Sequence, residues 1–439
     1  MQENKSPGVG QWTRRNFIRS AGAIAGASAL SGLGALPAVH AAGSDTIKFA
    51  LIGCGARGTG AAGQIMNSPH STKLVAMADV FPDKAQSSLE RLKKEHVNKV
   101  DVPPERIFLG FDAYQKAIDS GVDLVVLAAP PGFRPQQLEY AVKAKKHIFT
   151  EKPLAVDGSG VRSALRSAEL ARKNNTLLAV GLQRRHEPSY METVQRLQDG
   201  AIGDILYMRA FWNGDGVWNR TRPRLPRQTE MEYQIRNWYY FVWLCGDHVL
   251  EQHIHNLDVC NWVKNAHPVK ANGQGGRQVR TGKEFGEIYD HHFVEYEYAD
   301  GCRLYSQARH IPGCMKSVSE HAYGTKGRSN ISRYTIEGER TWKSDKKTVA
   351  SHQQEQLDMI DALVRGDVYN EGEYGAISTM TGILGRLATY SGKVVTFEEG
   401  LNSKISTMPE RVAWDADPPT LPDEDGFYKI PTPGKTKVV

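Results

Sequence analysis

The feature that most constrains the fold is a glycine-rich turn that directly follows a short apolar segment. The apolar segment, Ile47–Ile52, has the length and composition of a buried strand. It continues into the turn Gly53-Cys54-Gly55-Ala56-Arg57-Gly58, and small residues that suit a helix come next. Glycines at these spacings permit a tight turn and let backbone N–H groups approach a pyrophosphate at a helix N-terminus. The sequence therefore predicts that Gly53, Gly55, Arg57 and Gly58 bind a dinucleotide, and a glycine turn without a nucleotide is the alternative.

An acidic residue at the end of the next apolar segment indicates which dinucleotide is bound. Asp79 follows Leu74–Ala78 and lies about twenty residues beyond the last glycine, where a carboxylate binds the adenosine ribose hydroxyls. The same negative charge would repel a 2′-phosphate, so Asp79 favours NAD over NADP. Arg57 can reach a phosphate, which keeps NADP as the less favoured cofactor.

Apolar strand segments alternate with amphipathic helical segments from Thr46 to Gly181. The predicted strands are Ile47–Ile52, Leu74–Ala78, Leu124–Ala128, Ile148–Thr150 and Leu177–Val180, and the predicted helices include Pro82–Glu95, Pro135–Ala144 and Ser159–Lys173. Short continuous apolar strands separated by helices imply a parallel sheet covered on both faces. We therefore expect a doubly wound α/β Rossmann domain over residues 42–183.

The pattern changes after Gln183. Strands in which polar and apolar residues alternate are predicted at Ile205–Trp212, His292–Tyr298 and Arg303–Ala308, and helices at Ser189–Asp199, at about Asp247–Trp262, at Gln353–Val364 and at Ala376–Ser391. Such alternation indicates a largely antiparallel sheet with one open face. We expect an α+β substrate and oligomerisation domain over residues 184–400, followed by a surface tail over 401–439.

The N-terminus has the pattern of an export signal. The run Thr13-Arg14-Arg15-Asn16-Phe17-Ile18-Arg19 precedes an almost uncharged stretch, Ala21–Val39, and the small-residue site Val39-His40-Ala41. This order is typical of a twin-arginine signal peptide over residues 1–41, cleaved after Ala41. The stretch is too short and too rich in Gly and Ala for a transmembrane helix, which needs about 20 strongly apolar residues. We expect a periplasmic or otherwise exported protein with no stable membrane insertion after cleavage, and a retained anchor is the alternative.

Composition and cysteine spacing narrow the classes of partner. The net charge of +6 is spread along the chain with no basic block between aromatic residues, so no nucleic-acid partner is expected. The five cysteines show no CxxC spacing, which argues against a zinc knuckle or a redox dithiol. Buried free thiols are the favoured interpretation, and a Cys302–Cys314 disulfide is the alternative.

A lysine follows the fourth predicted strand of the Rossmann segment. Glu151-Lys152-Pro153 comes directly after Ile148–Thr150, and ligands of open parallel sheets bind at the carboxyl ends of the strands. Proline keeps Lys152 out of helical geometry, so its ammonium can project toward a substrate hydroxyl and the nicotinamide. Neighbouring positive charge would lower its pKa, which suits proton transfer or oxyanion stabilisation. A surface lysine on a loop is the alternative.

These motifs together resemble one family. The glycine turn, Asp79, Ala129-Pro130-Pro131, Glu151-Lys152-Pro153 and the segment from Gly181 to Pro188 are similar to those of the Gfo/Idh/MocA oxidoreductases, named for glucose–fructose oxidoreductase and inositol dehydrogenase. The resemblance implies a Rossmann domain followed by a mostly antiparallel sheet domain whose open face often forms dimers. It also implies action on sugars or cyclitols, a catalytic Lys152, and Pro130, Glu151 and Lys152 beside the cofactor.

The family's second catalytic element is an Asp-x-x-x-His on a helix. In the matching stretch here, Glu251 takes the place of the Asp and His255 that of the His. Residues i and i+4 share a helix face, so Glu251 can orient His255 and raise its basicity as a general base. His248 falls on the same face, and a metal triad with Glu251 and His255 is conceivable. A hydrogen-bonded pair is more common than a ligand set, so no metal is predicted.

Polar and aromatic residues around this helix are candidates for binding a sugar. The predicted substrate contacts are Arg185, His186, Trp238, Asp247 and His248. They belong to a wider cluster in which aromatic rings could stack on sugar C–H surfaces or simply pack the domain, namely Trp212, Trp218, Arg236, Trp238, Tyr239 and Tyr240. His291 and His292 begin a strand, and we interpret them as edge or interface polarity.

The predicted activity is hydride transfer between a sugar or glycoside hydroxyl and tightly bound NAD, in a protein exported with its cofactor. A second hypothesis is an NAD-dependent glycosidase or lyase that oxidises the sugar transiently and eliminates the aglycone. A third is a non-catalytic sugar-binding protein on the same fold, because fold alone does not fix function.

Overall fold

The computed structural model describes residues 46–217 and 221–439. Two sequence predictions, the signal peptide and a role for Trp218, lie outside the described residues. Within the described part of the chain, no helix is both long enough and apolar enough to cross a membrane.

The N-terminal sheet has six parallel strands in the order β3-β2-β1-β4-β5-β6. The strands are β1 (Ile47–Ile52), β2 (Thr72–Asp79), β3 (Ile107–Leu109), β4 (Leu124–Leu127), β5 (His147–Thr150) and β6 (Leu178–Val180). The helices around them are α2 (Ala56–Met66), α3 (Pro82–Glu95), α4 (Ala113–Ile118), α5 (Arg134–Lys143) and α6 (Gly158–Lys173). This strand order is that of a doubly wound Rossmann sheet, so the predicted fold class is confirmed.

The second sheet has nine strands and is mostly antiparallel. Its order is β14-β13-β12-β11-β7-β10-β9-β8-β15, and only β7 and β10 among the described pairs run parallel. The strands are β7 (Ile205–Gly214), β8 (Pro268–Gly276), β9 (His291–Tyr298), β10 (Arg303–His310), β11 (Ser317–Gly324), β12 (Gly327–Asn330), β13 (Thr335–Glu337), β14 (Trp342–Lys343) and β15 (Val395–Thr396). The open-faced antiparallel prediction is confirmed.

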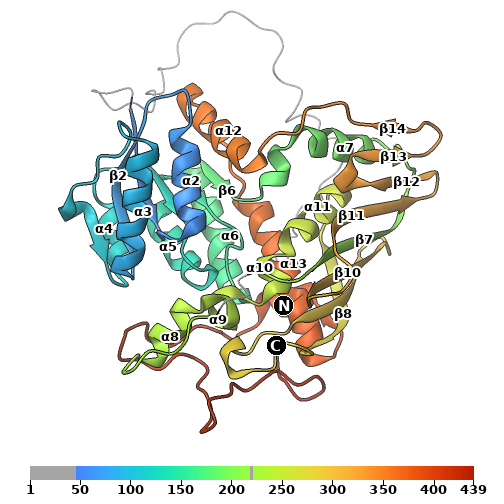
Figure 1. The fold of residues 1–439 in the computed structure, drawn as a ribbon. Coiled ribbons are helices and arrows are strands. Elements are labelled where there is room, and N and C mark those ends of the chain that lie inside the picture. Colours follow the sequence, from blue (N-terminus) through green and yellow to red (C-terminus); the bar gives the residue numbers. More distant parts are fainter. Residues whose placement is uncertain (1–45, 218–220) are drawn as a thin grey trace, which may run out of the picture. The chain divides into compact units, whose positions relative to one another are not determined.

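The helices that follow β6 pack on strands of the two sheets, on other helices or on short turns (Figure 1). They are α7 (Pro188–Gln198), α8 (Glu230–Arg236), α9 (Val242–Cys245), α10 (His248–Glu251), α11 (Ile254–Lys264), α12 (Ser351–Arg365), α13 (Gly372–Ser391) and α14 (Phe397–Asn402). Helix α11 packs on β7 and β11, and the long α13 packs on β8 and on α6. Helix α12 returns to the Rossmann sheet and lies against α2. Helices from the C-terminal part of the chain therefore pack against the helices of the Rossmann domain.

The single helix predicted over Asp247–Trp262 is wrong. The structure has two helices there, α10 and α11, with Gln252 and His253 between them. The cause is tertiary: the ring of His253 is fully buried and its Nε2 bonds the Ser306 hydroxyl at 2.7 Å. Glu251 and His255 therefore do not share one continuous helix face.

All five cysteines are free thiols, so the alternative of a Cys302–Cys314 disulfide is not adopted in this structure. Four of them are buried, as expected, whereas Cys314 is exposed. Cys54, inside the glycine turn, is buried, and burial raises the pKa of its thiol well above the usual value. It therefore acts as a small packing side chain in the turn.

Candidate functional site

The glycine turn connects β1 to α2 and leaves no room for side chains where the backbone is closest. Gly53 has φ +91°, and a Cβ there would lie 2.5 Å from the backbone nitrogen of Ala129. A Cβ on Gly58 would lie 2.0 Å from the carbonyl oxygen of Gly53. Gly55, which caps α2, has open space around its Cβ position. The turn is thus closed on its inner side and open at the helix N-terminus, where a pyrophosphate fits.

Asp79 ends β2 beside this turn and holds it. One carboxylate oxygen accepts a hydrogen bond from the Cys54 N–H at 2.7 Å, and the other accepts one from the Phe81 N–H at 2.9 Å. Burial raises the pKa of Asp79, and these backbone hydrogen bonds oppose the rise. The predicted ribose-binding residue therefore also fixes the loops after β1 and β2.

Arg57 lies in the first turn of α2 and points toward the loop after β5. Its Nε lies 2.8 Å from Oε1 of Glu151, and its side chain is 33 % exposed whereas that of Glu151 is 3 % exposed. Its Nη2 donates to Gln64 at 2.5 Å. Because these partners hold the guanidinium, the structure offers Arg57 as a bridge between the glycine turn and Glu151 rather than as a free phosphate ligand.

An arginine that sequence analysis did not single out joins two loops of this site. Arg134 is buried at the start of α5, and it donates to the carbonyl oxygens of Ala129, at 2.7 Å, and of Pro153. Burial lowers the pKa of Arg134 to about 10. The same guanidinium thus fixes the segment that contains Pro130 and the segment that contains Lys152. The sequence feature that could have indicated Arg134 is a charged residue directly after the Pro-Pro-Gly-Phe turn.

Lys152 stands at the carboxyl end of β5 and reaches the second domain. Its Nζ donates to the backbone oxygen of Glu251 at 2.6 Å and lies 2.9 Å from Oε1 of the same residue. The two side chains are 11 % and 9 % exposed. A nearly buried ammonium is therefore paired with one carboxylate at the mouth of the parallel sheet.

His255 lies in the first turn of α11 and belongs to the same electrostatic site. Burial lowers the pKa of its imidazole well below the usual value, and Lys152 is the charge that lowers it most. Its ring stacks against Trp212 of β7, with centroids 6.0 Å apart and planes at 26°. The imidazole is therefore neutral at neutral pH, and its lowered pKa makes it a weaker base than a solvent-exposed histidine. Glu251 bonds Lys152 and Gln252, so its expected role in orienting His255 is not what its contacts show.

Two of the predicted substrate residues take part in ion pairs. Arg185 donates two hydrogen bonds of 2.9 Å to Asp258, and its guanidinium lies over the Tyr374 ring at 3.8 Å. His186 lies 2.8 Å from Asp358 and 3.2 Å from Glu371, and its pKa rises to about 10 because these carboxylates outweigh the effect of burial. Both side chains link α11, α12 and α13 to the end of the Rossmann domain.

Trp238, a further predicted substrate residue, begins the short turn η4 (Trp238–Tyr240) and is half-buried. It packs edge-on to Tyr239, whose ring stacks in turn on His310 with centroids 6.3 Å apart. The aromatic cluster of the second domain therefore continues inward to a group of buried histidines.

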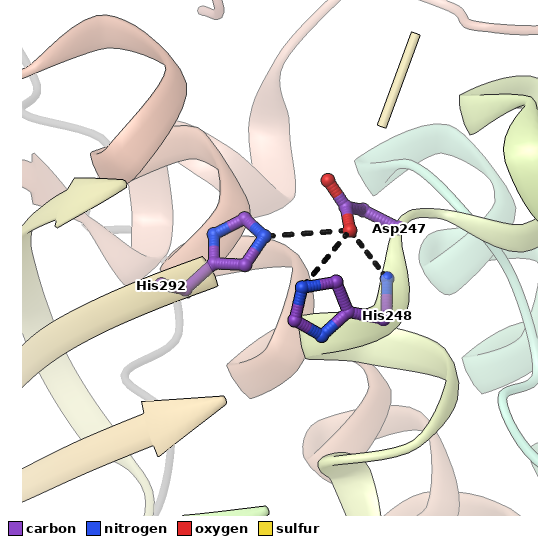
Figure 2. Close-up of side chains that lie close together, drawn as sticks. All are labelled: Asp247, His248 and His292. Carbon is purple, nitrogen blue, oxygen red and sulfur yellow. Dashed lines mark hydrogen bonds and ion pairs between the residues drawn. The ribbon is translucent and has the colours of Figure 1, made fainter. Parts of the chain in front are cut away.

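Asp247 and His248, the last two predicted substrate residues, are fully buried at the start of α10. One carboxylate oxygen of Asp247 lies 3.3 Å from Nε2 of His292 and 3.9 Å from Nε2 of His248 (Figure 2). His292 is on β9, between β8 and β10, and is 3 % exposed. The interpretation of His292 as edge or interface polarity is therefore wrong, because strand pairing turns its ring inward.

The structure does not gather the metal triad that the helical spacing suggested. Glu251 turns to Lys152, and His255 belongs to the next helix. Over residues 46–217 and 221–439, the group of His, Cys, Asp and Glu side chains whose donor atoms lie within 4.8 Å of one another is Asp247, His248 and His292. Sequence spacing could suggest Asp247 and His248 but not the third member.

The fold and the geometry of the site together define a class of protein. A doubly wound sheet with a glycine turn, an acid after β2 and a lysine after β5 is an NAD-binding Rossmann domain, here followed by an open-faced sheet domain. Residues 47–182 match the model of the Gfo/Idh/MocA oxidoreductase family with its NAD-binding Rossmann fold. The N-terminal domain is therefore similar to that family.

Curated relatives match part of the chain. An NAD-dependent scyllo-inositol 2-dehydrogenase of Bacillus subtilis is 23 % identical over 229 residues, which are 52 % of this chain and 57 % of the relative. A 2,7-anhydro-N-acetylneuraminate hydratase of Mediterraneibacter gnavus is 23 % identical over 259 residues, which are 58 % of this chain and 59 % of the relative. The chain thus spans under two thirds of the length of these relatives.

Solved structures extend the likeness to both sheets. A scyllo-inositol dehydrogenase of Lactobacillus casei, solved with NAD(H) and scyllo-inositol, superposes with a TM-score of 0.61 at 20 % identity. The match covers 80 % of this chain and 99 % of that one. The two chains therefore share a fold that includes the second domain.

Proposed function

We propose that this protein is an exported NAD-dependent oxidoreductase that transfers hydride between a hydroxyl of a sugar or glycoside and tightly bound NAD. The observation that carries the proposal is the pairing of Lys152 with Glu251 at the carboxyl end of β5, where the charge of Lys152 also acts on the buried His255. Relatives named as inositol dehydrogenases support a polyhydroxylated substrate.

The cofactor site fits a dinucleotide. Gly53, Gly55 and Gly58 form the turn for the pyrophosphate, and Asp79 stands at the end of β2 for the adenosine ribose. When bound, NAD supplies the hydride acceptor. Glu151 and Lys152 follow β5 at the same edge of the sheet, where Arg57 and Arg134 hold their loop.

Two side chains of this site can act on the substrate hydroxyl, one as a proton acceptor and one as a cation that stabilises the oxygen. His255 is buried and neutral, so its imidazole can take the proton of a substrate hydroxyl as a general base. The Lys152 ammonium stabilises the oxygen as that proton leaves, and Glu251 keeps Lys152 pointed into the site through two contacts. Trp212, stacked on His255, offers an apolar ring beside the same position.

Export explains why NAD would be held tightly. A twin-arginine signal carries a folded protein, and a compartment without a nicotinamide pool cannot replace a lost cofactor. The cofactor would then be recycled on a second, carbonyl substrate. The proposal of tight binding thus rests on the signal pattern in residues 1–41.

Mass spectrometry of cofactor released from the purified mature protein tests the proposal. We expect about one NAD per chain, retained through dialysis, which a glycoside reduces to bound NADH with formation of a keto product. A carbonyl compound should then reoxidise the NADH without its release. A protein that carries no nucleotide and does not bind added NAD would contradict the proposal.

A second candidate function is hydrolysis or elimination through transient oxidation of the sugar. The hydratase from Mediterraneibacter gnavus is the relative that favours it. Both functions begin with the same hydride step, so the test must follow the products. Release of aglycone with no net change in the cofactor selects elimination, and accumulation of a keto-glycoside selects dehydrogenation.

The open face of the second sheet is the surface we propose for homo-oligomer formation. Tyr207, Tyr305 and Tyr323 lie together on this face, Tyr207 stacked on Tyr323 with centroids 4.5 Å apart, and Phe293 nearby on β9 is 43 % exposed. A sheet face with exposed aromatic rings favours association with a second copy.

A further inference from the structure

The start of α10 and the middle of the second sheet bring three metal-binding side chains together. Asp247 lies between the rings of His248 and His292, and one of its oxygens faces a nitrogen of each ring (Figure 2). Its distances to the two Nε2 atoms are 3.9 Å and 3.3 Å, and all three side chains are without solvent exposure. No residue of this group is part of the Lys152 site.

The hydrogen bonds around His292 leave a lone pair facing the carboxylate. The hydroxyl of Thr389 donates within α13, to the carbonyl oxygen of Gly385 or of Arg386, each 3.1 Å away. Thr389 therefore accepts from Nδ1 of His292, 2.9 Å away. A neutral His292 with its proton on Nδ1 presents the Nε2 lone pair to Asp247. Two electron-rich atoms 3.3 Å apart call for a positive charge between them, either a second proton on the His292 ring or a metal ion.

His248 strengthens this requirement. Both of its ring nitrogens are buried without a hydrogen-bond partner, although buried polar atoms are rarely left unpaired. His310 stacks on it with ring centroids 4.2 Å apart, and neither nitrogen of that ring has a hydrogen-bond partner either. Imidazole nitrogens that lack protein partners in a dry site are suited to bind a metal.

The backbone of Asp247 is held in a conformation that normally needs glycine. Its φ is 73° and its ψ 160°, and non-glycine residues keep such angles only where the surroundings enforce them, commonly at functional sites. Here the other carboxylate oxygen accepts hydrogen bonds from the Tyr289 N–H at 3.0 Å and from the Tyr390 hydroxyl at 2.6 Å. The remaining oxygen accepts a hydrogen bond from the backbone N–H of His248 and faces the two histidine rings.

We infer that Asp247, His248 and His292 bind a divalent transition-metal ion, of which zinc fits the ligands best. Two imidazoles and one carboxylate are a common zinc ligand set that leaves a fourth position open. Bonds of about 2.0–2.2 Å in a tetrahedral site separate the donor atoms by roughly 3.3–3.6 Å. Asp247 and His292 already have that separation, and the 3.9 Å between Asp247 and His248 is slightly longer.

The surroundings suggest what the ion would do and how tightly it would bind. Thr389 is a hydrogen-bonding partner behind His292, of the kind that orients metal-bound histidines. The cationic Arg280 also acts on His248 and would weaken the binding of an ion there. Because α10 carries both His248 and Glu251, the ion would fix the helix that holds Lys152.

The test is zinc binding by the mature protein, without a polyhistidine tag and after treatment with a chelator. Titration calorimetry with zinc chloride should give one site per chain. His248→Gln and His292→Gln should each weaken binding by more than about 100-fold, and Thr389→Val by about 10–100-fold, the usual cost of losing an outer partner. His253→Gln is the matched control, because His253 is equally buried but bonds Ser306, and it should keep the site.

Equal zinc binding by the wild type and by the two ligand variants would overturn the inference. So would a nuclear magnetic resonance spectrum that shows His292 doubly protonated and unchanged at saturating zinc, since His292 and Asp247 would then form a simple ion pair. If a ligand variant fails to fold, zinc binding by the wild type alone tests the inference. An anomalous scattering peak between the three side chains after a zinc soak supports the site, and its absence rejects it.

Discussion

Lys152 is the residue whose removal separates chemistry from cofactor binding most cleanly. Its ammonium contacts Glu251 rather than the glycine turn, so Lys152→Met should leave the NAD content of the purified protein unchanged. Reduction of the bound NAD by a glycoside should slow by about 10²–10⁴-fold, the usual contribution of a proton-transfer group. Stopped-flow absorbance of the bound NADH measures this rate.

Lys146 provides the control for that experiment. It is also a partly buried lysine of the Rossmann domain, and its Nζ donates to the carbonyl oxygen of Val122 at 2.9 Å, away from the strand ends. Lys146→Met should leave the rate of reduction as in the wild type. Equal rates in Lys152→Met and the wild type would remove Lys152 from the reaction.

The buried imidazole of His253 makes the free energy of unfolding depend on pH. Burial lowers the pKa of this imidazole to about 3 in the folded protein, whereas the unfolded value is about 6.5. The unfolded chain therefore binds the proton first as pH falls. This one group lowers the free energy of unfolding by about 1.4 kcal/mol for each pH unit below about 6.5, in addition to what other buried histidines such as His248 and His310 contribute. The contribution of His253 is complete above that pH and is lost as pH falls toward 3.

Urea unfolding at pH 7, 6 and 5 measures this slope. His253→Gln should make it shallower by about 1.4 kcal/mol per pH unit at pH 5. Ser306→Ala removes the hydroxyl that bonds His253 but leaves the ring buried, so the slope should stay while stability falls at every pH. If His253→Gln left the dependence of the free energy of unfolding on pH unchanged, the assignment of that dependence to His253 would be contradicted.

At the scale of elements, Arg134 connects the loops that follow β4 and β5. Arg134→Met would leave the carbonyl oxygens of Ala129 and Pro153 buried without a donor. Each such loss costs about 1–3 kcal/mol, so we expect the free energy of unfolding to fall by about 2–6 kcal/mol. Arg166→Met, on the exposed side of α6, should change it by less than about 0.5 kcal/mol. Chemical denaturation of both variants checks the difference.

Local patterns predicted those elements whose signals lie within themselves. β1 and α3 have the bounds that the sequence indicated, because an apolar run before a glycine turn and a proline-started amphipathic segment specify their own ends. β3 was missed because it has only three residues and none of its side chains is fully buried. The break between α10 and α11 was missed because its cause, Ser306, is 53 residues further along the chain.

The residues of the site also divide into those that local patterns predicted and those that depend on contacts between distant parts of the chain. Glycine spacing and the place of Lys152 after a strand are local, so those residues could be located from sequence. The contact of Lys152 with Glu251 joins residues 99 positions apart, and the contact of Asp247 with His292 depends on the register of β9. No periodicity in a single segment carries that information.

At the scale of the whole molecule, the open sheet face predicts the oligomeric state. Phe293→Asp would place a charge among the aromatic rings of that face, where it would be desolvated in a contact with a second copy. We expect sedimentation velocity to show a homo-oligomer for the wild type and a shift to the monomer for Phe293→Asp. Leu421→Asp, 50 % exposed in the C-terminal tail, should leave the mass unchanged. A monomeric wild type would contradict the prediction.

The outer edge of β6 has a consequence for how this protein is made. The backbone N–H of Leu178 donates to Tyr369 at 3.1 Å, the N–H of Glu371 donates back to Leu178 at 2.8 Å, and the Glu371 carboxylate accepts the Val180 N–H at 2.7 Å. Without residues 369–371 this strand would present a bare template for pairing with other chains. We therefore expect that the nucleotide-binding domain cannot complete its folding on the ribosome before residues 369–371 have emerged. A fragment ending near residue 183 should aggregate. Maturation must wait until nearly the entire nascent polypeptide has emerged.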